Sequence, residues 1–466
     1  MADLVVEGDT IVTMDRHNRI VRDGAVAIDD GKIVAVGPRD EVVKLHKGNR
    51  SLQGRHKVII PGLINVHTHS SEKLVAGLVD DLDLYSWLQK VIYPMMMNQS
   101  EEDSYWSSLL AQVEMIKSGI TCFSDLFDSS GQDALETLLR SIEVSGMRAV
   151  VGRQIITKDG RPDELGVSVP EDIGEKMIAD TIRHIKRGKG RSDRTTVRFG
   201  IGNVSYASHS LISRIRSLAD ELDTGIHVHV AESVKELRYL KRTRNTTPVR
   251  YAREAGLLGP DVLAAHCVWV DDEEIGLLRE TGTKVAYNPV SNMKLADGVA
   301  PVWKMIEEGL TVGLGTDGAG SNDNLDMFAC MKMGAYLQKV STLNPMHLPS
   351  KKVLEMATIG GARALQMEDR IGSIEVGKNA DLAIIDVRTP NMTPVNDVVK
   401  QMACSCQPSN VDTVIINGNI VMEDRNLTRI DETATIEEAK HRAAKLIERM
   451  YDQPQDPTLD RSKRRT

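Results

Sequence analysis

The sequence predicts an α/β protein in which a (β/α)8 barrel is joined to a small β domain built from both ends of the chain. Residues 61–370 alternate apolar, strand-like runs with longer amphipathic stretches that are typical of helices. Residues 2–60, 372–387 and 411–424 consist instead of short strands separated by glycine turns. The chain has 466 residues, which suits one large domain and a smaller one.

The first 60 residues contain short strand-like runs next to turn glycines. These runs are Leu4–Val6, Thr10–Met14, Ala25–Ile28 and Lys32–Val36. The sequence DGKIVAVG around Gly31 has the turn chemistry of a β-hairpin. Because runs of the same character return near the C-terminus, we expect residues 1–60 and 371–430 to form one domain, with the barrel of residues 61–370 inserted between them. Residues 431–466 are expected to form a solvated amphipathic helix and a tail.

The middle of the chain alternates helical and strand patterns. The helical run Glu101–Ser118 precedes the strand Ile120–Asp125, and the helical run Ser208–Leu222 precedes the strand Gly225–Val230. The number and length of such units suit a (β/α)8 barrel. An open doubly wound sheet is the competing fold, but no GxGxxG fingerprint follows the first strand.

Charge and cysteine content exclude several classes of function. Lys plus Arg is 58 and Asp plus Glu is 66, a net charge of −8. Because the only basic run is the tail 461–465, we expect no nucleic acid partner. Five cysteines without regular spacing fit a reducing compartment. With no signal peptide and no apolar run of membrane length, we expect a cytoplasmic protein without a membrane partner. We also expect a homo-oligomer.

The segment VIIPGLINVHTHS, residues 58–70, carries the first chemical signal. His67 and His69 lie on one face of its strand, about 7 Å apart, because side chains alternate along a strand. Two neutral imidazoles at that spacing can bind one metal ion, and His suits zinc, iron or nickel. Taken alone, such a pair can equally be two polar residues that face solvent at a strand end.

Three later apolar strands end in side chains of the same kind. GIHVHVAES places His227 and His229 on one face, AAHC carries His266, and VGLGTDG carries Asp317. A single His or Asp at a strand end is usually structural. In a barrel, however, the C-terminal ends of the strands meet at one face, where functional side chains gather. We therefore expect a metal centre there, with one of His227 and His229 in a supporting role.

These motifs, in this order, resemble the amidohydrolase superfamily. HTH, HVHVAES, AAHC and GLGTDGAGSND occur together with DDLDLYSWL, NPVSNMKLADGVAPV and GSIEVGKNADLAIID. Within the superfamily, the chain looks most like the methylthioadenosine/S-adenosylhomocysteine deaminases and the related triazine chlorohydrolases. The resemblance covers nearly the whole chain. It implies a distorted (β/α)8 barrel with a β-sandwich from both termini, and a metal-dependent hydrolase that acts on carbon–nitrogen bonds of cyclic amidines.

The resemblance also implies a cofactor and roles for individual residues. It implies one divalent metal ion per chain, zinc with iron as the alternative, and no lysine stands where binuclear relatives place a bridging one. Glu232 resembles the proton shuttle, His266 the group that polarises the attacked site, and Asp317 a second proton acceptor. Water that the metal activates would attack an sp² ring carbon of a small heterocycle. The implied metal ligands are His67, His69, His229 and Asp317.

The chain departs from the deaminase pattern at two substrate-binding positions. Met96 stands where these enzymes usually carry a Glu that binds ribose, and Gly202 where they carry a His that contacts the nucleoside. We therefore expect a more apolar, altered pocket. Arg153 matches an arginine that meets the substrate's polar tail, although a surface arginine is an equal alternative. Trp87 is expected to stack on a flat ring.

Three functions remain open from the sequence. The first is hydrolytic deamination of an amino-substituted N-heterocycle with an adenosine-deaminase-like mechanism. The second is an s-triazine chlorohydrolase or aminohydrolase, which the lost nucleoside contacts favour. The third, of another class, is a non-catalytic relative that keeps the fold as a binding module.

Overall fold

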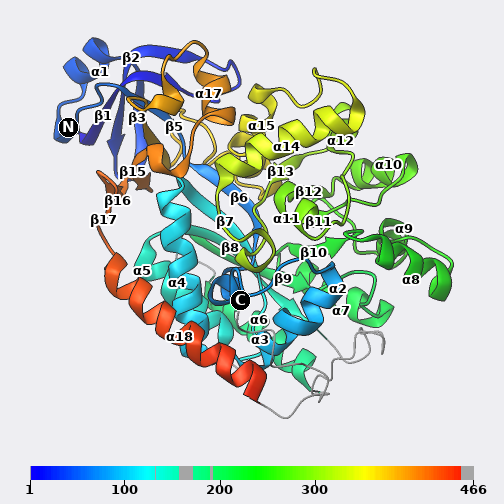
Figure 1. Ribbon diagram of the computed structural model, residues 1–466. Coiled ribbons are helices and arrows are strands. Elements are labelled where there is room, and N and C mark those ends of the chain that lie inside the picture. The colour runs from blue at the N-terminus through cyan, green and yellow to red at the C-terminus, as the bar shows by residue number, and fades with distance from the viewer. Residues whose placement is uncertain (1, 132, 157–171, 189–192, 453–466) are drawn as a thin grey trace.

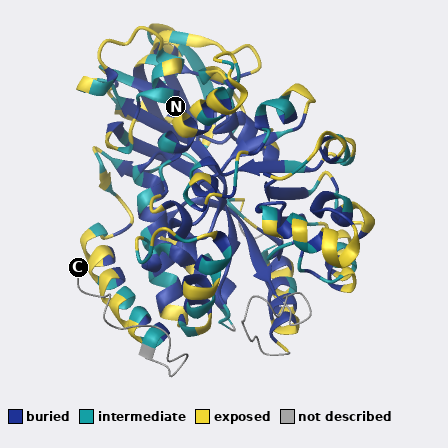
Figure 2. Cartoon of the chain, turned by 45° about the vertical axis from the view of Figure 1, so that its right-hand side comes forward, coloured by how far each residue is buried: buried dark blue, intermediate teal, exposed yellow. Residues whose placement is uncertain are grey.

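The computed structural model describes residues 2–131, 133–156, 172–188 and 193–452 (Figure 1). The middle of the chain forms an eight-stranded parallel sheet that curls into a barrel, and strands from both ends of the chain form a second sheet beside it. The barrel strands are dark blue in Figure 2 because they are buried on both faces, whereas the outer faces of the helices are exposed. The predicted α/β class and distorted barrel are therefore confirmed.

Neighbours in the barrel follow the order of the sequence, from β6 round to β13. The barrel strands are β6 (Leu63–Thr68), β7 (Ile120–Phe127), β8 (Arg148–Ile155), β9 (Thr195–Ile201), β10 (Ile226–Val230), β11 (Val262–His266), β12 (Lys284–Tyr287) and β13 (Val312–Leu314). The last and first strands meet just past β13, where the Asp317 N–H donates to the carbonyl of His67 over 2.9 Å. This contact brings both ends of the barrel sheet to the same site.

Helices connect the barrel strands and cover their outer face (Figure 1). Some of them begin at side-chain caps: Ser100 and Asp103 form a capping box for the helix that follows, and Ser208 caps another. The predicted helical runs 101–118 and 208–222 correspond to α4 and α7. The helices are α4 (Glu101–Lys117), α5 (Ala134–Ser145), α6 (Ile173–Gly188), α7 (His209–Glu221), α8 (Val234–Arg244), α9 (Pro248–Glu254), α10 (Asp272–Thr281), α11 (Pro289–Lys294), α12 (Val302–Glu307), α13 (Ala319–Asn322), α14 (Met327–Thr342), α15 (Ser350–Met356) and α16 (Ile359–Ala364).

A long excursion after β6 covers the C-terminal face of the barrel. It consists of four consecutive helical turns before α4, and several of its side chains face the site described below. These turns are η1 (Ser70–Val75), α2 (Leu84–Trp87), η2 (Leu88–Ile92) and α3 (Tyr93–Asn98).

The second sheet has nine strands in the order β17-β16-β15-β14-β5-β1-β2-β3, with β4 paired to β1. Its turns fold over one another, since Ala380 N–H donates to the Gly31 carbonyl and Gly418 N–H donates to that of Ala380. The sheet thus closes as a sandwich around its own apolar core. Its strands are β1 (Ala2–Val12), β2 (Ile20–Asp29), β3 (Lys32–Pro38), β4 (Gly48–Leu52), β5 (Lys57–Pro61), β14 (Leu382–Asp386), β15 (Val411–Ile416), β16 (Asn419–Glu423) and β17 (Asn426–Leu427), and helix α1 (Arg39–Leu45) packs on β2 and β3. Helix α17 (Val398–Cys404), between β14 and β15 in the sequence, packs on α14 and α15 of the barrel.

Helix α18 (Glu432–Asp452) ends the described part of the chain and runs along α4 (Figure 1). The guanidinium of Arg449 donates to the carbonyl of Asn98 over 3.1 Å and forms an ion pair with Asp103, so the helix is fixed to the excursion that covers the barrel. The tail predicted after it lies outside the described residues. Within the described ranges, we find no helix of the length and apolarity that crossing a membrane requires.

Candidate active site

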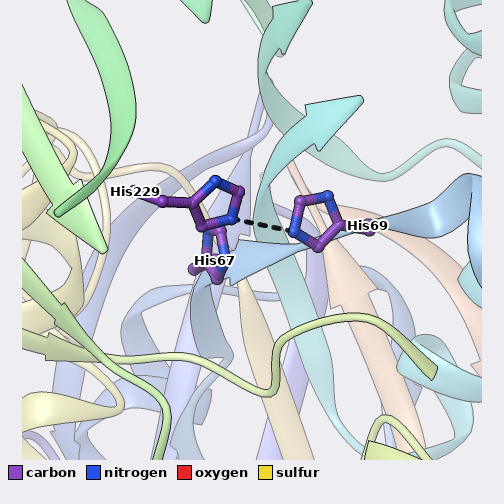
Figure 3. Close-up of side chains that lie close together, drawn as sticks. All are labelled: His67, His69 and His229. Atoms are coloured by element: carbon purple, nitrogen blue, oxygen red, sulfur yellow. Dashed lines mark hydrogen bonds between the residues drawn. The ribbon is translucent and has the colours of Figure 1, made fainter. Parts of the chain in front are cut away.

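Four histidines and an aspartate converge at the C-terminal face of the barrel. His67 is in β6 and His69 follows it, His229 is in β10, His266 ends β11, and Asp317 follows β13. All five are buried. The Nε2 atoms of His69 and His229 are 3.2 Å apart (Figure 3). Asp317 Oδ1 lies 3.2 Å from His67 Nε2 and 3.4 Å from His69 Nε2. The structure thus brings together every side chain that the sequence predicted as a metal ligand.

The hydrogen bonds of two of these rings, His69 and His229, determine which ring nitrogen carries a proton and which one faces the cluster. His69 Nδ1 donates to the carbonyl of Leu126 over 2.6 Å, and His229 Nδ1 donates to the carbonyl of Gly202. Since a carbonyl only accepts, Nδ1 of each ring carries a proton, and Nε2 is the atom that each ring turns towards the other. Two Nε2 atoms this close share either a proton or a metal ion, and although burial acts in the opposite direction, the carboxylate of Asp317 raises the pKa of His69 well above its usual value. Three imidazoles and a carboxylate suit a divalent metal ion.

The ring of His67 is oriented by a further histidine, His227. His67 Nδ1 shares a hydrogen bond of 2.9 Å with Nε2 of His227, whose Nδ1 lies 3.3 Å from Ser124 Oγ. His67 Nε2 makes no hydrogen bond with the described residues and points towards Asp317. A partner on the far nitrogen fixes the ring orientation that a metal ligand requires. The supporting histidine of the HVHV motif is thus His227.

Asp317 is held in a sparsely populated backbone conformation, with φ of +65°. Its carbonyl accepts hydrogen bonds from Thr68 and Thr316, both 2.9 Å long, and its Oδ1 accepts one from Gly318 N–H. Although burial acts in the opposite direction, the imidazoles of His67 and His69 hold the pKa of the Asp317 carboxyl well below its usual value. The side chain is therefore a carboxylate.

Glu232 and His266 face one another beside the cluster. His266 Nδ1 lies 2.9 Å from the amide nitrogen of Asn292, a donor, so Nδ1 accepts and the ring proton is on Nε2. That Nε2 lies 3.6 Å from Glu232 Oε1. Burial lowers the pKa of His266 to about 3, so the ring is neutral. Burial and the nearby carboxylates of Asp297 and Glu236 raise the pKa of Glu232 well above its usual value, which favours a carboxyl that can hold a proton.

A cavity opens from this cluster towards the excursion after β6. Of the four predicted substrate-binding residues, Trp87 and Gly202 line it. Its remaining walls are largely apolar, with a few polar groups near the histidines. The described lining residues are His69, Glu72, Leu84, Tyr85, Trp87, Leu88, Ile92, Tyr93, Asp128, Gln154, Ile155, Ile156, Ile201, Gly202, Asn203, Tyr206, Ala207, Leu211, His229, Glu232 and Asp317.

The other two predicted substrate-binding residues, Met96 and Arg153, lie away from this cavity. Met96 is 1% exposed and packs in the hydrophobic core under α3. Arg153 is neither at the surface nor among the described lining residues. Its guanidinium forms a buried ion pair with Asp180 and donates to the carbonyl of Gly131 over 2.5 Å.

Sequence reasoning missed two carboxylates in the cavity wall, Glu72 and Asp128. Asp128 directly follows β7, so the strand-end rule that identified the other ligands applied to it as well. Glu72 lies three residues after His69 in η1. No periodic pattern in the sequence marks Glu72 as a site residue. Its position is set by contacts with the segment at the other end of the barrel sheet, which is distant in sequence.

The chain matches a known protein family and a curated relative over most of its length. A match to the amidohydrolase family spans residues 58–421, and a short match to an imidazolonepropionase-like composite domain of bacteria covers residues 24–46. The chain is 39% identical over 450 residues to the 5-methylthioadenosine/S-adenosylhomocysteine deaminase of Pelotomaculum thermopropionicum, covering 96% of this chain and 100% of that protein.

Solved structures share the fold over nearly the whole chain. The zinc-bound crystal structure of an adenosine deaminase from Xanthomonas campestris has a TM-score of 0.89 and 29% identity, and the match covers 96% of this chain and 99% of that one. The zinc complex of the atrazine chlorohydrolase from Arthrobacter aurescens has a TM-score of 0.85 and 22% identity, covering 94% and 100%, a likeness of fold alone. With its barrel, its strand-end histidines and these matches, the chain belongs to the amidohydrolase family.

Proposed function

We propose that this protein is a metal-dependent hydrolase that removes an amino group from an sp² ring carbon of an N-heterocycle. The observation that carries the proposal is the pair of opposed Nε2 atoms of His69 and His229, with Glu232 beside them in the same cavity. The deaminase names of the relatives support the reaction class. Release of ammonia from amino-substituted heterocycles by the metal-loaded protein tests it, and no release from any of them would contradict it.

The geometry of the cluster supports a metal site. His67, His69, His229 and Asp317 would hold one ion per chain, and three nitrogens with one oxygen favour zinc, with iron as the alternative. When bound, such an ion lowers the pKa of a coordinated water from about 15.7 towards 7. Metal analysis of the purified and reconstituted protein decides the number, and either two ions per chain or none would contradict a mononuclear site.

The proton transfers fall to groups of the chain itself. Glu232 is placed to accept a proton from the attacking water and to deliver one to the ring nitrogen or to the leaving amine. His266 is placed to donate a hydrogen bond from Nε2 and so polarise the attacked site. Asp317, fixed by Thr68 and Gly318, would accept the second proton.

The pocket is proposed to differ from that of nucleoside deaminases. Gly202 contributes only backbone to the wall, and its carbonyl is occupied by His229. Trp87 would lie along the face of a flat ring. Loss of a buried hydroxyl's partner costs roughly 1–3 kcal/mol, so ribose binding should suffer. We expect a compact alkylated aminotriazine to have a higher kcat/KM than methylthioadenosine, and a wide margin for the nucleoside would contradict an altered pocket.

Two further functions can be separated by simple assays. A triazine chlorohydrolase would release chloride from a chlorinated ring at a rate comparable to ammonia release from the amino analogue. A non-catalytic binding module would show no turnover for a chelator to abolish. Measuring both leaving groups before and after chelation distinguishes the three functions.

A further inference from the structure

Two buried carboxylates in the cavity have no part in the mechanism above. Glu72 and Asp128 are each 1% exposed, and both line the cavity. One ligand-type atom from each of them and from His69 lies within 4.8 Å of the other two. His69 Nδ1 is bonded to Leu126, and its Nε2 faces the proposed metal position. The two carboxylates are therefore left without a third ligand for an ion of their own.

The carboxylate of Glu72 is seated in a space that two glycines leave open. A Cβ atom on Gly318 would lie 1.9 Å from Glu72 Oε2, and one on Gly320 would lie 2.8 Å from it. Gly320 N–H donates to this Oε2 over 3.2 Å. Within the described ranges we find no other hydrogen bond to the Glu72 carboxylate. One oxygen is thus fixed by backbone, and the group as a whole is part of the cavity wall.

Asp128 is held in a similar way from the neighbouring strand. Its Oδ1 accepts a hydrogen bond from Ser71 Oγ, next in sequence to Glu72. The Ser71 carbonyl in turn accepts from Ser107 Oγ and from the Gln99 side chain, over 2.7 and 2.8 Å. This support keeps the two carboxylates close together despite their like charges.

The charges of the cavity-lining side chains indicate which kind of ligand Glu72 and Asp128 bind. Four carboxylates line it, at Glu72, Asp128, Glu232 and Asp317, and no Lys or Arg does among the described lining residues. A divalent ion at the histidines would offset two of these four negative charges. Burial raises the pKa of both Glu72 and Asp128, so a bound cation is what would hold the two groups in their ionised form. Ionised carboxylates only accept hydrogen bonds, and their strongest partners are charged N–H groups.

We propose that Glu72 and Asp128 form a subsite for the N–H groups of a cationic substrate edge, such as an amidinium or guanidinium-type edge of an amino-substituted heterocycle. This inference rests on the proposed function and narrows its substrate class. The apolar walls around Trp87 would contact the ring faces, while the carboxylates accept from the ring's amino and protonated nitrogen atoms. A neutral ring with acceptors at this edge would leave both carboxylates unpaired and would be rejected.

A binding experiment tests the subsite without any turnover. Benzamidine and benzamide have nearly the same shape, but only benzamidine is a cation with N–H groups on both arms. Their dissociation constants are measured by titration calorimetry on the metal-loaded wild-type protein, on Glu72→Gln and on Asp128→Asn. Glu175→Gln, which removes an exposed carboxylate paired with Arg214, is the matched control.

We expect wild type and Glu175→Gln to bind benzamidine at least about tenfold more tightly than benzamide, and each cavity variant to lose most of that preference. Equal affinity for the two probes in wild type would overturn the proposal. So would a second metal ion per wild-type chain that Glu72→Gln removes. Ammonia release is assayed separately, so selective binding without turnover would contradict the proposed function alone, and turnover without selectivity would contradict the subsite alone.

Discussion

At the scale of single residues, the site depends on strained strand ends. His266 and Asp317 have φ angles of +75° and +65°, in the left-handed region that non-glycine residues rarely adopt. Such residues cost roughly 1–3 kcal/mol each and persist only where the surroundings fix them. Here Asn292 fixes the ring of His266, and Thr68 with Gly318 fixes Asp317. The strain places both side chains at the face where the ligands meet.

The proposed proton shuttle gives a direct prediction. Glu232→Gln keeps the shape of the side chain but cannot carry the proton, so kcat should fall by about 10²–10⁴-fold. Bound metal, measured by elemental analysis, and the far-ultraviolet circular dichroism spectrum should not change. Glu273→Gln on the exposed side of α10 should retain wild-type turnover. A near-normal kcat in Glu232→Gln would remove this residue from the mechanism.

The histidine behind the metal site should matter without being a ligand. His227→Leu leaves Nδ1 of His67 without its partner, so the ring loses its fixed orientation. Loss of such a partner typically weakens metal affinity by about 10–100-fold. Competition with a coloured chelator measures this affinity, and Ser124→Ala, which removes only the outer hydrogen bond, should have a smaller effect. Unchanged affinity in His227→Leu would contradict the supporting role.

Site residues at the ends of barrel strands were predictable from the sequence, whereas the residues that contact the other side chains of this region were not. The apolar strands around His67, His229, His266 and Asp317 indicated where those side chains emerge. The environment of Arg153 was hidden, because its partner Asp180 is on a helix whose packing no local pattern encodes. Glu72 was hidden for a similar reason: its glycine seat at residues 318–320 comes from the opposite end of the barrel sheet.

At the scale of elements, the closure between β6 and β13 decides whether the ligands meet. Asn65 on β6 donates to Thr316 Oγ1 over 2.7 Å and accepts from Thr316 N–H over 3.0 Å. Both residues are fully buried. Side-chain hydrogen bonds of this kind hold β6, which carries His67, next to the segment that carries Asp317.

Asn65→Ala should therefore destabilise both the fold and the metal site. It leaves the buried Thr316 N–H without an acceptor and the Thr316 hydroxyl oxygen without a donor, which costs about 1–3 kcal/mol of unfolding free energy. Urea unfolding of the metal-free protein measures this loss, and metal should dissociate more easily from the variant. The control Asn419→Ala, at an exposed position of β16, should stay within about 0.5 kcal/mol of wild type. Equal stability of the two variants would contradict the closing role of Asn65.

Strand β1 shows where element prediction from the sequence fails. We expected two short strands here, Leu4–Val6 and Thr10–Met14. The structure has one strand, and Gly8 pairs with Gly24 in an unbroken register with β2. A Cβ on Gly8 would lie 3.0 Å from the side chain of Ile59, so the glycine is there for close packing and not for a turn. Helices α4 and α7, whose caps and apolar faces are local, were predictable.

At the scale of the whole molecule, a buried ion pair joins the barrel to the terminal sheet. Arg148, on β8, donates from Nε to Asp381 Oδ2 over 2.8 Å and from Nη2 to Oδ1 over 3.2 Å. Asp381 also accepts from the Asn417 N–H over 2.8 Å, and its carbonyl accepts from Gly62 N–H over 2.9 Å. Asp381 thus connects three segments that are distant in sequence.

Removing one charge of this pair should lower the unfolding free energy more than removing both charges does. Asp381→Asn keeps an acceptor for Asn417 but leaves the Arg148 guanidinium buried without a counter-charge, for which we expect a loss of about 3–5 kcal/mol. The double variant Arg148→Met/Asp381→Asn removes the uncompensated charge and should recover part of that loss. Chemical denaturation of the two variants and wild type measures the difference. A double variant less stable than Asp381→Asn would show that the charge of Asp381 is not what Arg148 requires.

The pairing of β5 with β14 has a consequence for synthesis on the ribosome. β5 leads through Gly62 directly into β6, yet its antiparallel partner β14 begins at Leu382, about 320 residues after β5 ends. At a translation rate of about 5–20 residues per second, one edge of β5 stays unpaired for roughly 15–65 s. All of the metal-ligand strands leave the ribosome during that interval. An unpaired strand edge can pair with another nascent chain and cause aggregation. The yield of folded protein should therefore depend on how well chaperones cover this edge of β5.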